Sequence, residues 1–238
     1  MKLLMATRTD ESVREYTKYT IPILRKYAKE WDADFKVLDS SFGSSVWKIL
    51  AFYDLLKSYN RILHVDSDIV MNKNCPNIFN IVSFNSVGLI FEDRGSREGN
   101  RRKEIAKIKQ RFGGNEHWTR GYFNAGFFLV SQIHCDMFTR INGQLWDGVL
   151  LEQTHLNYQM MRLGYEYIDL GYKFNHMSMF SEAWNGSPSR FDSHVIHYAG
   201  GAKFPDKGKR SKVQLIRDDI EEIYNSENIN FNSNLEQC

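Results

Sequence analysis

The chain has 238 residues, of which 42% are hydrophobic and 25% are charged. This length and composition are those of an ordinary folded globule with a sizeable core. The formal net charge of +2 gives no strong overall field, which argues against binding to nucleic acid or to a membrane through charge alone. No apolar run of about 18 residues occurs, and this excludes a membrane-spanning helix.

The three cysteines, Cys75, Cys135 and Cys238, are widely spaced. They fit neither a disulfide framework nor a zinc cluster. The apolar opening at 1–6 is too short for a signal peptide. We therefore expect a reducing, cytoplasmic environment, with a peripheral place at a membrane left open.

Strands and helices are expected to alternate through the first ninety residues. The predicted elements are a strand at 2–7, a helix from Val13 to Trp31 with Asp10 as N-cap and Pro22 as a kink or break, a strand at 34–39, a helix at 47–59, a strand at 62–65, a short helix at 76–81 and a strand at 87–91. This alternation predicts an α/β fold with a mostly parallel mixed sheet flanked by helices. No Gly-x-Gly-x-x-Gly or P-loop pattern is present, which argues against those two nucleotide sites.

The second part of the chain begins with a basic segment at 94–111, closed by Gly113 and Gly114 as a possible hinge. Its plainer interpretation is a solvated helix or mobile loop, and its functional one is a flap over an anionic ligand. Further elements are predicted as a strand at 122–130, helices at 134–142 and 150–163, strands at 165–170 and 195–198, and a helix at 218–224, with Gly164 ending the second helix.

Two carboxylates, Asp66 and Asp68, follow the apolar strand at 62–65. Because side chains alternate along a strand, both should project to one side at its carboxyl end, where open α/β sheets bind ligands. Two such oxygen donors suit Mg²⁺ or Mn²⁺ held together with a substrate's phosphates. An Asp-x-Asp pair alone arises by chance in about half of chains this long, so other motifs must support it.

A polar amide and a glycine interrupt the apolar strand predicted at 122–130. Asn124 needs hydrogen-bond partners if it is buried, and Gly126 permits the close approach of another group. The aromatic-rich stretch at 177–184 predicts either a wall of an acceptor site or core packing.

Four separated segments carry a family resemblance: His64-Val65-Asp66-Ser67-Asp68, Tyr122-Phe123-Asn124-Ala125-Gly126, Glu152-Gln153-Thr154-His155-Leu156-Asn157 and His197-Tyr198-Ala199-Gly200-Gly201-Ala202-Lys203. In order and spacing they resemble the metal motif, the Phe-Asn-Ser-Gly strand, the Asp-Gln-Asp-x-Leu-Asn segment and the His-x-x-Gly-x-x-Lys motif of glycosyltransferase family 8. This is the glycogenin and lipopolysaccharide galactosyltransferase type, among the nucleotide-sugar glycosyltransferases of the GT-A fold. Ala125, Glu152 and Phe204-Pro205 depart from the family's usual residues.

The resemblance implies one GT-A domain over 1–226, with a nucleotide-binding half at 1–91 and a donor-sugar and acceptor half at 92–226. The Asn- and Ser-rich composition of the end of the chain predicts a disordered tail at 227–238. The resemblance also implies that Asp66, Asp68 and His197 bind a divalent cation, with Asp66 near the ribose as well. An imidazole beside carboxylates favours Mn²⁺, with Mg²⁺ left open. On sequence alone, His197 is an ordinary strand histidine.

Residues that resemble the family's donor-binding positions lie in both halves of the chain. They are Thr7, Arg8, Lys48, Asp66, Ser67, Asn124, Gly200 and Lys203. Thr7 and Arg8 would contact the uridine. The two lysines would meet the diphosphate or be solvated surface lysines, and Gly200 would let backbone amides approach the phosphates.

The resemblance places Gln153, Glu152 and Lys203 in the chemistry. Gln153 would lie beneath the anomeric carbon and stabilise an oxocarbenium-like state, Glu152 would lie on the acceptor side, and Lys203 would add charge at the leaving group. Asn124 would hold a donor-sugar hydroxyl. The acceptor would enter on the leaving-group side with retention of configuration. An inverting mechanism would instead need a carboxylate base, either Glu152 or Asp192.

The function implied is Mn²⁺-dependent transfer of a hexose-type sugar from a nucleotide diphosphate sugar to a carbohydrate or glycoconjugate acceptor. UDP is favoured, with GDP and dTDP open. Two alternatives stay open at this point. One is a sugar nucleotidyltransferase that releases pyrophosphate, and the other is a non-catalytic module that binds an anionic polymer through residues 94–111.

Overall fold

The computed structural model describes residues 1–42 and 45–224, so the predicted tail at 227–238 lies outside the described residues. The central sheet has the order β2-β1-β3-β6-β5-β7. Its strands are β1 (Leu3–Arg8), β2 (Asp34–Leu38), β3 (Arg61–Val65), β5 (Ser86–Leu89), β6 (Phe127–Ser131) and β7 (Glu166–Asp169). The pairs β1–β2, β1–β3 and β5–β7 are parallel, whereas β6 is antiparallel to both neighbours. The prediction of an α/β fold with a mostly parallel mixed sheet is confirmed.

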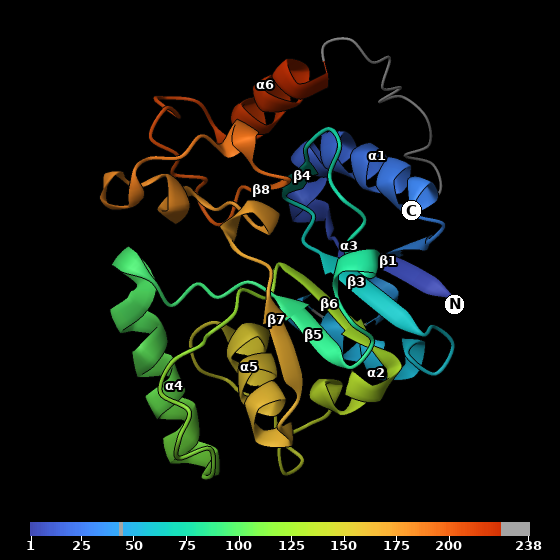
Figure 1. Ribbon diagram of the computed structural model, residues 1–238, viewed down its shortest axis with the longest axis vertical. Coiled ribbons are helices and arrows are strands. Elements are labelled where there is room, and N and C mark those ends of the chain that lie inside the picture. Colours follow the sequence, from blue (N-terminus) through green and yellow to red (C-terminus); the bar gives the residue numbers. More distant parts are fainter. Residues whose placement is uncertain (43–44, 225–238) are drawn as a thin grey trace.

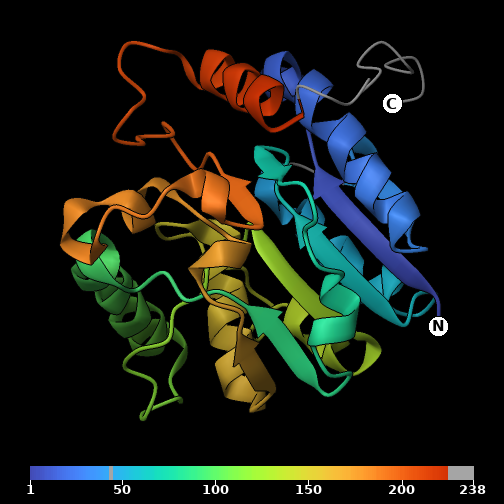
Figure 2. The same cartoon turned by 45° about the horizontal axis from the view of Figure 1, so that its top comes forward.

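Helices cover the sheet, as Figures 1 and 2 show. They are α1 (Arg14–Glu30), α2 (Phe52–Leu55), α3 (Ile78–Ile81), α4 (Glu98–Phe112), α5 (Leu151–Leu163) and α6 (Lys212–Tyr224). Because side chains alternate along β3, Leu63 and Val65 join the core beneath α1 and α6, whereas Ile62 joins the core with Phe52 and Leu156. No helix among the described residues is long and apolar enough to cross a membrane.

A second, two-stranded sheet joins β4 (Ile69–Met71) to β8 (Val195–His197). The strands are antiparallel, and Ile69 lies opposite His197. The backbone N–H of Tyr198 also donates to the Asp68 carbonyl over 3.0 Å. This pairing brings a residue near the end of the chain beside the carboxylates that follow β3.

Several predicted elements differ in extent from the observed ones. The strand predicted at 122–130 begins only at Phe127, because the chain turns at Asn124–Gly126, where the Asn124 side chain accepts a hydrogen bond from the Gly126 N–H. The helices predicted at 47–59 and 134–142 are largely 3₁₀ turns, over Ser45–Ala51 and Gln132–Phe138. Helix α1 continues through Pro22 without a break.

The basic segment forms the regular helix α4, which packs beside α5 (Figure 1). Ile105 and Ile108 turn inward to a third core with Trp118 and Tyr158. The helix ends at Gly113, whose φ of 72° suits a glycine. The segment is therefore a helix with one buried face rather than a mobile loop.

Candidate metal and donor site

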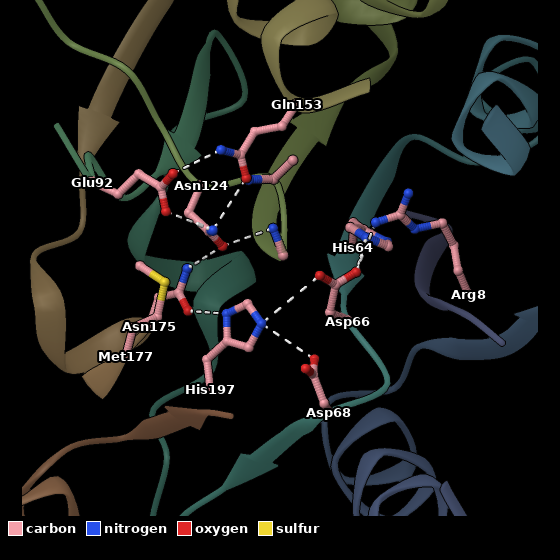
Figure 3. Close-up of polar contacts among 12 residues, drawn as sticks. Arg8, His64, Asp66, Asp68, Glu92, Asn124, Gln153, Asn175, Met177 and His197 are labelled. Atoms are coloured by element: carbon pink, nitrogen blue, oxygen red, sulfur yellow. Dashed lines mark hydrogen bonds and ion pairs between the residues drawn. The ribbon is translucent and has the colours of Figure 1, made fainter. Parts of the chain in front are cut away.

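Three side chains converge at the carboxyl end of β3. Nε2 of His197 lies 3.2 Å from Oδ1 of Asp68 and 3.9 Å from Oδ2 of Asp66 (Figure 3). One ligand atom from each residue lies within 4.8 Å of the others. A tight turn after β3, in which the Ile69 N–H donates to the Asp66 carbonyl over 3.2 Å, brings the two carboxylates to the same side.

Each of these side chains has one atom tied to the protein and one atom left facing the shared space. Oδ1 of Asp66 accepts from Nη2 of Arg8 over 2.9 Å and faces Nε2 of His64 at 3.1 Å, which leaves Oδ2 toward His197. Nδ1 of His197 lies 2.8 Å from Oδ1 of Asn175, which leaves Nε2 toward the acids. Such outer partners fix the orientation of metal-binding side chains.

Asp68 follows the same pattern. Its Oδ2 accepts from Nζ of Lys212, 2.6 Å away, so that Oδ1 faces His197. Two carboxylate oxygens and one imidazole nitrogen, each held from outside, form a donor set that fits Mn²⁺ or Mg²⁺. The structure brings the predicted ligands together, and ion binding itself stays a prediction.

The charges around the acids keep them ionised. Burial alone would raise the pKa of Asp66, but the Arg8 guanidinium and His64 outweigh it and hold that pKa well below its usual range. Burial alone would also raise the pKa of Asp68, but His197 and Lys212 outweigh it and lower that pKa. Burial lowers the pKa of His64 itself, so its imidazole is neutral at pH 7. The acid pair is thus anionic and ready to bind a cation.

Gly126 explains how these groups come so close. A Cβ added at this position would lie 2.3 Å from Cε1 of His197 and 2.8 Å from Oδ2 of Asp66. Both contacts are shorter than real Cβ atoms allow. The close approach predicted for this glycine is therefore observed, and the group that approaches is the candidate metal centre.

Beside the centre lies a buried network that contains the amides of Asn124 and Gln153. Nδ2 of Asn124 donates to Oε2 of Glu92 over 2.9 Å, and Nε2 of Gln153 donates to Oε1 of Glu92 over 2.8 Å. Oε1 of Gln153 accepts from the Ala125 N–H over 3.0 Å. Oδ1 of Asn124 accepts from Nδ2 of Asn175 over 3.0 Å, which joins the network to His197. These contacts fix both amides beside the metal centre (Figure 3).

Glu92 is the fully buried anion of this network. Arg97 and Arg101, from the start of the basic segment, both pair with its carboxylate, Arg97 over 3.3 Å. Of the segment's basic residues, these two are thus part of the site, whereas Arg102 pairs with Glu98 on the surface of α4. The ion pairs of Arg97 and Arg101 with Glu92 anchor the start of α4 to a buried carboxylate, which accounts for these two basic residues without a flap.

Glu152 is the second residue of α5, and Arg8 links it to the candidate metal centre. Nη1 of Arg8 donates to Oε1 of Glu152 over 3.0 Å, while the same guanidinium holds Asp66. Burial raises the pKa of Glu152, and Arg8 opposes that shift. The guanidinium of Arg8 is therefore shared between two carboxylates.

A cleft of about 240 Å³ opens beside the acid pair. It is lined by Arg8, Thr9, Asp10, Val13, Tyr16, Val46, Lys48, Asp66, Ser67 and Asp68. Nζ of Lys48 donates to the Thr9 carbonyl over 2.7 Å on its wall. The side chain of Thr7 is buried nearby on β1, and its Oγ1 has no hydrogen-bond partner among the described residues. Of the predicted nucleotide-side residues, Arg8, Lys48, Asp66 and Ser67 thus line one cleft, whereas Thr7, next to Arg8 in the chain, is buried and does not line it.

Other predicted residues lie outside this cluster. Lys203 and Gly200 are exposed on the chain after β8, and Asp192 is exposed on a turn before it. The structure gives none of the three a hydrogen bond or ion pair with the acid pair among the described residues. Of the aromatic-rich stretch, Met177, Met179 and Phe180 are core residues and Trp184 is 53% exposed. Core packing is therefore correct for most of that stretch.

Sequence reasoning missed Glu92, Asn175 and Lys212. Glu92 carried a usable signal, because it follows an apolar strand just as Asp66 follows β3. Asn175 and Lys212 had none, since each lies in a segment whose contacts with the site arise only on folding.

Comparisons with known proteins bear on the family and on the fold. The sequence profile described as "Glycosyl transferase family 8" matches residues 7–205. No curated protein sequence matches the chain. Because the profile spans most of the chain, the protein belongs to glycosyl transferase family 8, and it is a glycosyltransferase.

Solved structures show the same fold at low identity. A glycosyltransferase involved in glycosylation of the major capsid of PBCV-1 is 14% identical with a TM-score of 0.55, over 84% of this chain and 94% of that one. The galactosyltransferase LgtC, in complex with donor and acceptor sugar analogs, is 15% identical with a TM-score of 0.51, over 92% and 94%. Mouse xyloside xylosyltransferase 1 is 11% identical with a TM-score of 0.54, over 85% and 99%. The predicted GT-A fold is thereby confirmed.

Proposed function

We propose that the protein transfers a hexose-type sugar from a nucleotide diphosphate sugar, preferably a UDP-sugar, to a hydroxyl of a glycan or glycoconjugate. The observation that carries the proposal is the convergence of the free atoms of Asp66, Asp68 and His197 at the edge of a polar cleft. This donor set favours Mn²⁺, with Mg²⁺ as the alternative. When bound, such an ion neutralises charge that develops on a departing diphosphate.

The cleft wall supports the nucleotide side of the proposal. Arg8 and Ser67, two of the residues that we propose contact the nucleotide, line the cleft. Lys48 is 3% exposed on the same wall, where its ammonium can attract a diphosphate. Lys203 and Gly200 follow His197 closely in the chain, and we propose that they approach the diphosphate when the donor binds.

The buried amide network supports the sugar side. Asn124 and Gln153 are held by Glu92, so their carboxamides are oriented before a substrate arrives. A carboxamide at Gln153 can stabilise positive charge at an anomeric carbon through its oxygen, and it is a weak nucleophile. Oε1 of Glu152 is bound by Nη1 of Arg8, so a guanidinium already occupies the oxygen that a general base would use. These features support retention of configuration over inversion.

The substitution Asp68→Asn tests the proposal. Because the carboxylate is one of three candidate ligands, turnover of a UDP-sugar with Mn²⁺ should fall at least about 100-fold, a loss typical of removing one preorganised electrostatic group. Activity would be measured as release of the nucleoside diphosphate over a panel of UDP-, GDP- and dTDP-sugars. Unchanged turnover in this variant would exclude the proposed site.

Asp54→Asn is the matched control, since Asp54 is an exposed acid paired with Lys57 on the surface. It should keep wild-type turnover. Release of pyrophosphate instead of a nucleoside diphosphate would favour a nucleotidyltransferase. The anomeric configuration of the product, read by NMR, separates retention from inversion.

A further inference from the structure

Lys212 is a cation of the candidate metal centre that the family motifs do not include. Its Nζ lies 2.6 Å from Oδ2 of Asp68 and 4.8 Å from the ring centroid of Tyr16 on α1. The side chain is 21% exposed. Asp68 and Tyr16, which both line the cleft, thus hold the ammonium, and it binds Oδ2 of Asp68 while Oδ1 faces His197.

Lys212 is the first residue of α6, and a lysine is not favoured at this position of a helix. The Ser211 hydroxyl accepts from the Gln214 N–H over 3.1 Å, and the Gln214 side chain accepts from the Ser211 N–H over 2.8 Å. This capping box makes Lys212 the first residue of α6. A helix N-terminus carries partial positive charge and disfavours a cation there. The stabilising partner of the lysine is Asp68 instead.

The negative charge around the acid pair is consequently offset in part within the protein, because two cations face three carboxylates. Arg8 pairs with Asp66, and Lys212 pairs with Asp68. A divalent ion placed among the free atoms of the centre would lie within a few ångströms of the Lys212 ammonium and would be repelled by it. The negative charges of a nucleoside diphosphate would offset that repulsion.

We propose that Lys212 is a resident counter-ion of Asp68 that weakens binding of a free divalent cation and makes cation binding depend on the diphosphate. This inference rests on the proposed function, because it assumes that a nucleoside diphosphate and a divalent cation share the site. By linkage, the cation must strengthen diphosphate binding by the same factor. The first turn of α6 is therefore part of the donor site.

Binding of Mn²⁺, followed by its EPR signal with and without UDP, tests the inference in the full chain. Wild-type protein should bind Mn²⁺ weakly alone and at least about tenfold more tightly with saturating UDP. Lys212→Met should bind Mn²⁺ alone at least about tenfold more tightly than wild type, and UDP should add less. Lys212→Gln provides a second neutral variant if the first is poorly folded.

Two controls separate charge from shape. Lys212→Arg keeps the positive charge and should resemble wild type, and so should Lys209→Met, which removes an exposed lysine. If the neutral variants bind Mn²⁺ alone no more tightly than wild type, Lys212 is not a counter-ion and the inference is wrong. If wild type binds no Mn²⁺ even with UDP, the Mn²⁺- and UDP-dependent form of the proposed function fails.

Discussion

Gly126 shows how one residue can decide whether the site forms. A methyl group in its place would overlap His197 and approach Asp66, the two groups that meet across the centre. Gly126→Ala should therefore displace the imidazole, weaken Mn²⁺ binding in the presence of UDP at least about tenfold, and destabilise the fold by about 1–3 kcal/mol through overpacking. EPR titration and urea denaturation would measure the two effects.

Gly99→Ala is the corresponding control on α4, where an added Cβ meets no atom within 4 Å. It should leave Mn²⁺ binding unchanged and should not lower the free energy of unfolding, because alanine has a higher helix propensity than glycine and Gly99 lies in the first turn of α4. Wild-type metal binding in Gly126→Ala would show that the centre tolerates a side chain there.

His176 makes stability depend on pH. The residue is fully buried, its ring nitrogens each lie 2.7 Å from a hydroxyl, of Ser193 and Ser181, and burial lowers its pKa to about 4. Because the unfolded chain binds a proton near pH 6.5 and the folded chain does not, stability is lost as the pH falls from about 6.5 to about 4. At pH 5 the loss from this residue should be about 2 kcal/mol.

His176→Gln removes that proton-binding difference while keeping a polar side chain. Its free energy of unfolding should be lower at pH 7, since a buried hydrogen-bonded ring is lost, and should fall less steeply than that of wild type between pH 7 and pH 5. Parallel pH profiles for the two proteins, measured by urea denaturation, would contradict this account.

At the scale of elements, α6 is fixed to the body of the protein by a buried ion pair. Nε of Arg190 lies 2.6 Å from Oδ2 of Asp219, and the Tyr198 hydroxyl donates to the same oxygen over 2.6 Å. Asp219 is 2% exposed. The ion pair joins α6 to the turn before β8, and the hydrogen bond from Tyr198 joins α6 to the residue that follows β8. Both contacts therefore support the positions of His197 and Lys212.

Asp219→Asn should lower the free energy of unfolding by about 3 kcal/mol, because it leaves the buried Arg190 charge only partly compensated by Asp206. Asp218→Asn, at the adjacent partly exposed position, removes ion pairs with Arg210 and Arg217 and should cost less than about 1 kcal/mol. Urea denaturation of the two variants gives the comparison. Equal losses would mean that the buried pair does not anchor α6.

Helix α4 is anchored by the same principle at the other side of the site. Arg97 and Arg101 reach a fully buried carboxylate, Glu92, which also holds the amides of Asn124 and Gln153. An unpaired carboxylate would be costly at that depth, so helix and network stabilise each other. Two positive charges of the basic segment are therefore paired inside the protein and are not available on its surface. This weakens the alternative that the segment binds an anionic polymer.

At the scale of the whole molecule, the site is assembled from segments far apart in the chain. Figure 3 shows Arg8 from β1, Asp66 after β3, Gln153 from α5 and His197 from β8 gathered around one region. The sheet order β2-β1-β3-β6-β5-β7 places the ends of β3 and β6 side by side. The antiparallel pairing of β4 with β8 then brings in the late histidine.

Local patterns in the sequence were enough for much of the fold. Hydrophobic periodicity predicted the main strands and helices, because burial of one face is imposed on each element by its own residues. It predicted the wrong start for β6, because the Asn124 side chain accepts the Gly126 N–H hydrogen bond and turns the chain before the strand begins. The division of the chain into a nucleotide half and a sugar half stays a prediction.

The α/β class, the family and the residue types available for a site follow from the amino-acid sequence, because spacing and short motifs carry them. Which charges meet follows from folding: Arg8 lies between Asp66 and Glu152, Glu92 lies between two arginines, and Lys212 lies on Asp68. Such pairings depend on distances across the folded chain, and no local pattern encodes a contact between residues 68 and 212.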